Sequence, residues 1–345
     1  LVYNADHPKP KNLSKLGDGS LEVVAGSSHE ERLIYLKNVI KDLSWKSTTE
    51  LATEELLQLV ADEVIDYTIA DSNEVALNKP FLLKLRVAFD ISEPQQLAWM
   101  MQRTEDMSLY KEVVNFFDKI NKNGELTRMI EKAYGHVDNL NYVGTIVFRR
   151  HIAKRLPAFE DLFREAARKN NLDWRMLSAI GYQESLWNPK AVSPTGVRGL
   201  MMLTQKTASD MGIKNRLDPK GSIDGGAKYY ALTHKRIPKQ IKEPDRTWMA
   251  LAAYNVGFGH LEDARKITEQ RGLDPDKWID VKTSLPLLAQ RKWYKKTKYG
   301  YARGWEPVRY VENIRSYYDI LSRDEDIDYQ ETPDPDVFQI MPNVL

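Results

Sequence analysis

The chain has 345 residues, of which 42% are apolar, and its 50 Lys and Arg against 49 Asp and Glu leave a formal net charge of +1. This length is typical of two domains with buried cores. The absence of cysteine excludes disulfides, thiolate nucleophiles, cysteine-bound zinc and iron–sulfur clusters. No run of about 18 apolar residues occurs, and the first residues lack the basic-then-apolar order of a signal peptide, so we expect the chain as written to be soluble.

The small net charge conceals blocks of opposite sign. Residues 1–137 hold 16 Lys and Arg against 22 Asp and Glu, whereas residues 138–345 hold 34 against 27. The last 22 residues, from Asp324, contain seven acids and no Lys or Arg, which leaves 138–323 with 34 bases against 20 acids. Two interpretations stay open: the charges separate by chance among solvated faces, or the basic block meets an anionic partner.

In the first part of the chain, short apolar runs alternate with segments of helical spacing. The predicted strands are 21–25, 64–70, 85–89 and 97–101, and the predicted helices are 30–36, 74–77, 108–121 and 124–133. Strands that alternate with helices indicate an α/β domain with a largely parallel sheet, in which ligands bind at the carboxyl ends of the strands. We therefore predict such a domain over residues 1–137.

The pattern changes after residues 134–139, because almost every later segment has helical period. The predicted helices are 156–169, 173–186, 204–211, 222–236, 245–254, 261–270 and 307–321. The expected fold class is therefore α+β and multidomain: a partial α/β domain followed by an all-α domain over 138–323. The acidic, proline-containing segment 324–345 is expected to be a flexible tail.

Glu184 is the first candidate for chemistry. It lies at Leu177 plus seven and Ile180 plus four, so it falls on the apolar stripe of its predicted helix. Burying a charged carboxylate there costs free energy unless a cation or hydrogen-bond donor is its partner, and desolvation raises its pKa. One interpretation is an ion pair with an arginine such as Arg198; the other is a general acid that protonates a glycosidic oxygen.

Two further segments each favour a structural role when taken alone. The pair Met201-Met202 follows two glycines and a proline, and methionine pairs are usually part of a core. Tyr254 and Asn255 come just before Gly257 at the end of a predicted helix, which is ordinary helix-stop chemistry.

Residues 291–305 interleave six cations with five aromatic side chains. This composition is typical of nucleic-acid binding by stacking and phosphate neutralisation, of a sugar-binding cleft, or of a solvated loop without function. No recognised nucleic-acid module precedes the segment. The six histidines lack metal-ligand spacing, and the Walker, dinucleotide and serine-elbow motifs are missing, so we expect no metal and no cofactor.

Four motifs together have the order and spacing of one enzyme family. They are Gly181-Tyr-Gln-Glu-Ser185, Gly199-Leu-Met-Met202, Ala253-Tyr-Asn-Val-Gly257 and Tyr310-Val311. This set resembles the family 1 lytic transglycosylases, which have a fold like goose-type lysozyme, and most closely their membrane-bound F group, over about residues 140–322. The resemblance implies that Glu184 is the single catalytic acid and base.

The resemblance also implies supporting residues. Substrate-binding or supporting positions are Ser185, Gln183, Met201, Met202, Tyr254, Asn255 and Tyr310, and a possible glycan cleft contains Tyr299, Tyr301 and Trp305. Met202 stands where the family motif usually has glutamine, so a carboxamide contact to substrate is not expected there. For Tyr310 another interpretation is an ordinary core stripe with Ile314, Tyr317 and Leu321.

The implied activity is that of a peptidoglycan lytic transglycosylase. It cleaves the β-1,4 bond between N-acetylmuramic acid and N-acetylglucosamine without water and gives 1,6-anhydromuramoyl products. No Asp or Glu follows Glu184 up to Thr207, so the substrate's N-acetyl group would replace the second carboxylate of ordinary glycosidases. The alternatives are a sensor that docks on glycan without cleaving it, and nucleic-acid binding through 291–305, which the motifs disfavour.

The first part of the chain resembles periplasmic amino-acid-binding proteins. Leu1-Val-Tyr3 resembles the strand that crosses between the two lobes, 12–90 the second lobe and 105–135 the returning helices. The first half of lobe one and a lipid-anchoring signal are therefore expected upstream of this chain. The resemblance implies a periplasmic location at the outer membrane, peptidoglycan strands as partner, no nucleic acid, and a small amino-acid or muropeptide ligand that regulates activity.

Overall fold

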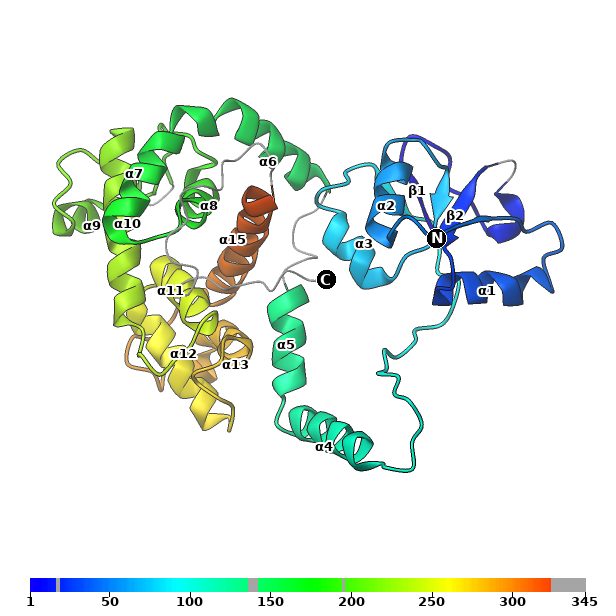
Figure 1. Ribbon diagram of the computed structural model, residues 1–345. Coiled ribbons are helices and arrows are strands. Elements are labelled where there is room, and N and C mark those ends of the chain that lie inside the picture. Colours follow the sequence, from blue (N-terminus) through cyan, green and yellow to red (C-terminus); the bar gives the residue numbers. More distant parts are fainter. Residues whose placement is uncertain (17–18, 136–141, 194–195, 324–345) are drawn as a thin grey trace. The chain divides into compact units, whose positions relative to one another are not determined.

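A computed structural model describes residues 1–16, 19–135, 142–193 and 196–323 (Figure 1). The chain forms two compact units, Leu1–Leu126 (unit 1) and Thr127–Leu345 (unit 2), each of which is described by itself. The boundary expected between residues 137 and 138 and the expected tail 324–345 lie outside the described residues.

Unit 1 contains a small mixed sheet. Its strands are β1 Val2–Asn4, β2 Leu21–Val24, β3 Lys46–Thr48, β4 Tyr67–Thr68 and β5 Leu85–Val87, in the order β3-β2-β4-β1-β5. Strand β2 is parallel to β3 and β4, whereas β1 is antiparallel to both of its neighbours, β4 and β5. The parallel arrangement expected from the sequence thus holds for four strands, and β1 reverses the direction between two of them.

Helices cover both faces of this sheet. They are α1 Ser28–Lys37, α2 Thr53–Ala61 and α3 Ser72–Asn78. A 3-10 turn lies at Leu13–Lys15, and α4 Ser108–Lys122 follows farther along the chain and belongs to neither core of the sheet. Leu33 of α1 packs with Val23 on one face, while Leu56 of α2 packs with Val2 and Leu85 on the other. Successive strand residues point to opposite faces, so β1 contributes Tyr3 to the first core and Val2 to the second. Polar β3 and helix α2 were not predicted.

The predicted strand 97–101 is wrong. In the structure these residues form no regular element, and Trp99 and Met100 are 69% and 98% exposed. The Trp99 ring contacts the Phe117 ring of α4 edge to face, with 5.0 Å between centroids. An apolar run becomes a strand only where a neighbouring strand accepts its backbone hydrogen bonds, and none lies beside it in the described chain.

Unit 2 is helical. Its elements are α5 Glu125–Tyr134, which begins at the end of unit 1, α6 Tyr142–Lys154, α7 Glu160–Asn170, α8 Trp174–Ser185, α9 Gln205–Asp210, α10 Pro219–Arg236, α11 Asp245–Val256, α12 Phe258–Gln270, α13 Trp278–Ser284, α14 Arg291–Tyr294 and α15 Trp305–Arg323, with 3-10 turns at Leu156–Ala158 and Leu285–Ala289. All seven predicted helices are confirmed. Helices α6, α13 and α14 were missed.

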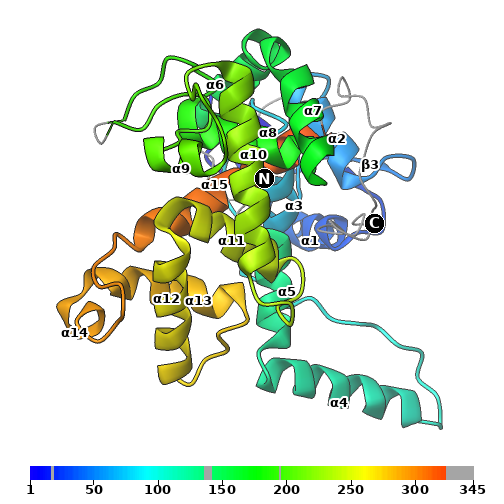
Figure 2. The same cartoon turned by 90° about the vertical axis from the view of Figure 1, so that its left-hand side faces the viewer.

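Helix α15 packs against both α8 and α11 in the centre of unit 2 (Figures 1 and 2). Asp173 caps the start of α8 by accepting a hydrogen bond from the Arg175 backbone N–H at 2.8 Å. The Tyr318 hydroxyl of α15 donates to the same carboxylate at 2.8 Å, which joins the two helices. Within the described ranges no helix is both long and apolar enough to span a membrane.

Candidate active site

Glu184 lies in the last turn of α8. The helix ends because Leu186 and Trp187 both adopt left-handed backbone angles, each with φ of 54°. The Trp187 indole then folds back into the core, 1% exposed, and donates a hydrogen bond to the Ser178 carbonyl at 2.9 Å. This reversal holds the Glu184 carboxyl at the carboxyl end of a helix that is otherwise buried, with part of its own surface open to solvent.

The surroundings of Glu184 favour its neutral form. Burial raises the pKa of its carboxyl from 4.5 to about 7, while a hydrogen bond from Tyr310 acts in the opposite direction. That bond runs from the Tyr310 hydroxyl to Oε1 of Glu184 at 2.6 Å. In the described part of the chain Glu184 makes no ion pair, so the Arg198 pairing considered from the sequence is absent. The unfavourable field at a helix carboxyl end works in the same direction as burial.

Tyr254 from α11 completes this cluster. Its ring is stacked on Tyr310, with 6.4 Å between centroids and 18° between planes. Its hydroxyl donates a hydrogen bond to the Met201 carbonyl at 3.3 Å. Burial, and then the nearby charge of Glu184, raise the pKa of both tyrosines well above the usual value. Both hydroxyls therefore remain neutral donors beside the acid.

The turn that carries Met201 is held tightly against α10. Gly199 has φ of 86°, and a Cβ there would lie 2.1 Å from the Arg216 carbonyl, so only glycine fits. The buried Met201 backbone N–H donates to Ser222 Oγ at 3.1 Å. The Arg216 guanidinium donates to the carbonyls of Leu203 at 2.6 Å and Gly196 at 3.2 Å. These bonds fix the carbonyl that Tyr254 contacts.

Other residues expected at the site differ in their placement. Gln183 accepts a hydrogen bond from the Asn313 side chain at 3.1 Å, which again joins α8 to α15. Ser185 donates to the Gly181 carbonyl at 3.1 Å, so its hydroxyl is directed along the helix. Met202 is half-buried with φ of 44°, and Asn255 is exposed.

Of the expected cleft residues, Tyr299 and Tyr301 lie on the loop before α15, and Trp305 is the first residue of that helix. Tyr299, Tyr301 and Trp305 are 53%, 54% and 50% exposed. The buried Asp263 carboxylate holds this loop by accepting the backbone N–H groups of Lys298 at 3.1 Å and Tyr299 at 2.8 Å. No contact joins these rings to Glu184 in the described residues, so their part in a glycan cleft stays a prediction.

The structure brings together Glu184, Tyr310, Tyr254 and Met201. Three residues that were not predicted from the sequence also belong to this arrangement: Asn313, Ser222 and Arg216. Asn313 follows Tyr310 by three positions on one helix, and that spacing was a usable signal. Nothing local marks the other two, because their partners are distant in sequence. Among the described residues, no group of three or more His, Cys, Asp or Glu is placed to hold a metal ion.

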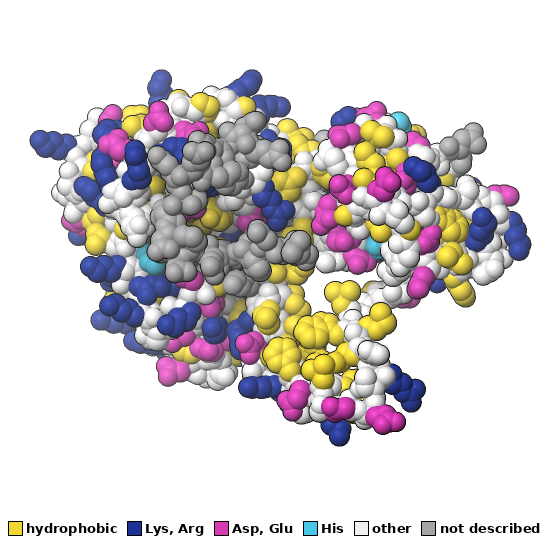
Figure 3. Space-filling model, viewed as in Figure 1, with side chains coloured by type: hydrophobic (Ala, Val, Ile, Leu, Met, Phe, Trp, Pro, Cys, Tyr) yellow, Lys and Arg dark blue, Asp and Glu magenta, His cyan; other side chains and the backbone are white. Residues whose placement is uncertain are grey.

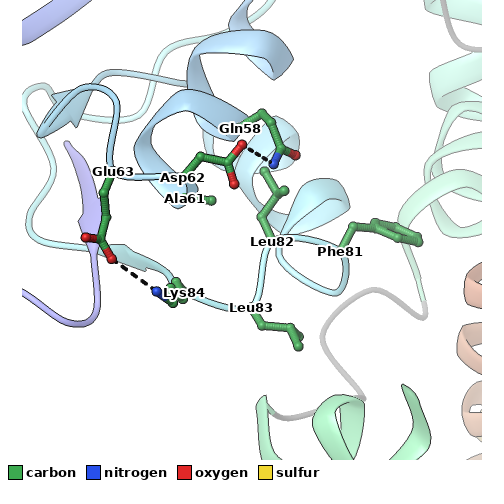
Figure 4. Close-up of a pocket in the computed structure, with 8 residues that line it drawn as sticks. All are labelled: Gln58, Ala61, Asp62, Glu63, Phe81, Leu82, Leu83 and Lys84. Atoms are coloured by element: carbon green, nitrogen blue, oxygen red, sulfur yellow. Dashed lines mark hydrogen bonds and ion pairs between the residues drawn. The ribbon is translucent and has the colours of Figure 1, made fainter. Parts of the chain in front are cut away.

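Unit 1 contains a pocket of about 360 Å³ (Figure 4). Its apolar part includes Leu82, and its charged groups are already engaged: Lys84 pairs with Glu63 at 3.1 Å, and Asp62 accepts from Gln58 at 2.8 Å. The pocket lies where the chain leads into β4 and β5, at their amino ends. Ligands of such sheets bind at the opposite, carboxyl ends, so we assign no ligand to this pocket.

Comparison with known proteins bears on the cluster around Glu184. The model of the transglycosylase SLT domain matches residues 161–277, which include Glu184, Met201 and Tyr254. The chain is 52% identical over 324 residues to a membrane-bound lytic murein transglycosylase F of Alkalilimnicola ehrlichii, covering 94% of this chain and 66% of that protein. The chain belongs to this family. It is also 51% identical over 322 residues to the membrane-bound lytic murein transglycosylase F of Ectopseudomonas mendocina, covering 93% of this chain and 66% of the relative.

The chain thus spans 66% of the length of these family members. A solved structure, the 70-kDa soluble lytic transglycosylase of Escherichia coli, matches 53% of this chain and 27% of its own, with 23% identity and a TM-score of 0.38. The SLT match ends at residue 277, before Tyr310. The place of Tyr310 at the site therefore rests on its 2.6 Å bond to Glu184 and not on that match.

Proposed function

We propose that this chain is a lytic transglycosylase of murein, which cleaves the β-1,4 bond between N-acetylmuramic acid and N-acetylglucosamine and leaves a 1,6-anhydromuramoyl end. The observation that carries the proposal is the Glu184 carboxyl, which makes no ion pair with the described residues, is hydrogen-bonded to Tyr310 and has a pKa of about 7. A carboxyl group with that pKa both donates and accepts a proton near neutral pH. The family membership of the chain supports the same reaction.

The proposed reaction uses Glu184 twice. The protonated carboxyl donates its proton to the glycosidic oxygen while the bond from that oxygen to the muramoyl anomeric carbon breaks. The N-acetyl oxygen of the same sugar bonds to the anomeric carbon in its place. The muramoyl 6-hydroxyl then displaces this oxygen and gives its proton to the Glu184 carboxylate, which restores the acid.

A single carboxylate is enough for this scheme. The influences on the pKa of Glu184 are burial and the Tyr310 bond, and no second acid among the described residues is near enough to change it. Ordinary glycosidases place two carboxylates across the scissile bond. The lack of a second carboxylate near Glu184 among the described residues favours participation by the substrate's own N-acetyl group.

Glu184→Gln tests this proposal. We expect release of soluble fragments from intact murein sacculi to fall by about 100- to 10,000-fold, because the amide cannot transfer the proton. The matched control is Glu269→Gln, the same change at an exposed position of α12, with activity unchanged. Mass spectrometry identifies the products, since an anhydro end is lighter than a reducing end by one water.

Three results would contradict the proposal. Equal release by wild type and Glu184→Gln removes the role of Glu184. Reducing ends among the products indicate a muramidase. Retention on sacculi without any product, equal in both proteins, indicates a domain that only docks on glycan.

We further propose that the intact protein works in the periplasm at the outer membrane, held by an anchor upstream of this chain, and that unit 1 regulates unit 2 by binding a small amino-acid or muropeptide ligand. The word "membrane-bound" in the relatives' names supports the first part. The resemblance of residues 12–90 to one lobe of an amino-acid-binding protein supports the second.

An aromatic surface of Tyr299, Tyr301 and Trp305 is proposed to contact the glycan.

A further inference from the structure

A second pocket lies in unit 2, between α9 and the loop that leads into α10 (elements in Figure 1). Its volume is about 570 Å³, and its lining includes the polar side chains Gln205, Ser209 and Asn215, the cations Lys214 and Arg216, and an apolar side chain, Ile213. The lining of this pocket therefore combines hydrogen-bond donors, positive charge and an apolar side chain.

The charge of this pocket is unbalanced. None of its lining residues is acidic. The two acids that flank it in sequence are engaged elsewhere: Asp210 pairs with Lys206 at 3.3 Å, and Asp218 caps α10 by accepting the Gly221 backbone N–H at 2.8 Å. Lys214 is exposed and makes no ion pair with any described residue. The pocket thus has an ammonium group available for an anion.

The donors of the lining differ in availability. Arg216 already uses its guanidinium on the carbonyls of Leu203 and Gly196. The Asn215 side-chain oxygen accepts the Leu217 backbone N–H at 3.0 Å, and its amide nitrogen makes no hydrogen bond to the described residues. An incoming anion would therefore meet the Lys214 ammonium and the Asn215 amide nitrogen first.

The pocket adjoins the candidate active site through Arg216. The same side chain that lines the pocket holds the Gly199–Leu203 turn, whose Met201 carbonyl contacts Tyr254 beside Glu184. The pocket and the Glu184 cluster are thus linked through a single turn, which Arg216 holds from one side and Tyr254 contacts from the other.

We propose that this pocket binds a carboxylate of the peptide that a murein strand carries on its lactyl groups, with Lys214 supplying the charge, Asn215 a hydrogen bond and Ile213 contact with aliphatic parts of the peptide. The inference rests on the proposed function, because it names a second part of the same substrate. It makes peptide-bearing strands better substrates than bare ones.

The test compares two substrates with two variants. We expect Lys214→Glu to lower kcat/KM at least fivefold on peptide-bearing glycan strands, and Lys214→Gln to lower it less, because only the first adds repulsion. On strands stripped of peptide by an amidase, both variants should stay within twofold of wild type. The exposed position of Lys214 leaves the core untouched.

The control is Lys239→Glu, an equal charge change at an exposed position of the same unit outside the pocket. A matching loss in this control, an equal loss on both substrates, or no loss in Lys214→Glu overturns the inference while leaving the proposed reaction intact. Failure of the proposed reaction is visible separately, as full activity of Glu184→Gln on both substrates.

Discussion

At the scale of single residues, the proposed chemistry depends on the proton of Glu184. A glutamate with a pKa of 4.5 is protonated in about one molecule in 300 at pH 7. Burial raises the pKa to about 7, so about half of the molecules hold the proton at that pH. Tyr310 limits this rise by stabilising the carboxylate, so acid and base forms are both accessible.

The first residue-scale prediction concerns pH. Wild-type kcat/KM should decline as pH rises through about 7, because Glu184 loses the proton that it must donate. Tyr310→Phe removes a donor to the charged form, so this decline should move to higher pH. The rate at pH 7 should fall about tenfold, since the lost bond also orients the carboxyl. The measurement is a pH profile on soluble glycan strands.

Tyr317→Phe is the matched control. This tyrosine lies on the same helix and packs its ring against Phe148 and Tyr182, away from the Glu184 carboxyl. Its profile should coincide with that of wild type. A decline that stays in place or moves to lower pH in Tyr310→Phe would show that the hydroxyl does not set the pKa of Glu184.

At the scale of elements, the site depends on how the Gly199–Leu203 turn is held. Met202 has a left-handed backbone, which is uncommon for a residue with a side chain and persists only where its surroundings enforce it. Ser222 and Arg216 supply those restraints from the far side of the turn. They are positioning residues, since their bonds end on the turn and not on Glu184.

Ser222→Ala tests the turn. The variant leaves the Met201 backbone N–H buried without its acceptor, which costs about 1–3 kcal/mol. We expect a lower Tm and a kcat reduced about tenfold, because relaxation of the turn moves the Met201 carbonyl away from Tyr254. KM should change less than kcat.

Thr268→Val provides the comparison. It removes a buried hydroxyl that donates a hydrogen bond to the Ala264 carbonyl on α12. Like Ser222→Ala, it therefore loses one buried hydrogen bond. Its Tm should fall while kcat stays at the wild-type value. Parallel losses of kcat in both variants would show that activity only follows stability.

At the scale of the whole molecule, charge distinguishes the two parts of the chain. Residues 138–323 hold 34 Lys and Arg against 20 Asp and Glu, and these cations are frequent on the face of unit 2 that Figure 3 shows. Residues 1–137 are acidic, with 16 against 22. A basic helical unit attracts a polymer that carries carboxylates, as the proposed substrate does, whereas an acidic unit does not.

The whole-molecule prediction concerns regulation. Titrating muropeptides into a full-length protein of this family should release or absorb heat, and the same ligand should change the rate of sacculus cleavage. The Glu184→Gln variant should bind with the same affinity, because the proposed ligand site lies in unit 1. Absence of heat together with an unchanged cleavage rate would refute regulation by such ligands.

Most helices of unit 2 are predictable from the amino-acid sequence, which also indicates Glu184 as the candidate acid. Period-3.6 burial is a local property, so the spacing of Leu177, Ile180 and Glu184 predicts both the helix and a carboxyl on its buried side. The motif order led to the family in the same way. Local spacing was less reliable for strands, because a strand depends on a distant partner.

Which side chains contact one another depends on the three-dimensional fold. The bond between Tyr310 and Glu184 joins residues 126 positions apart, and it resolved whether Tyr310 serves the core or the acid: it is buried and also contacts the carboxyl. Contacts between distant segments also decide three other features. They are the antiparallel direction of β1, the exposure of residues 97–101 and the hydrogen bonds by which Arg216 holds the Gly199–Leu203 turn. Each depends on contacts between distant segments, whose free energy no local pattern of residues contains.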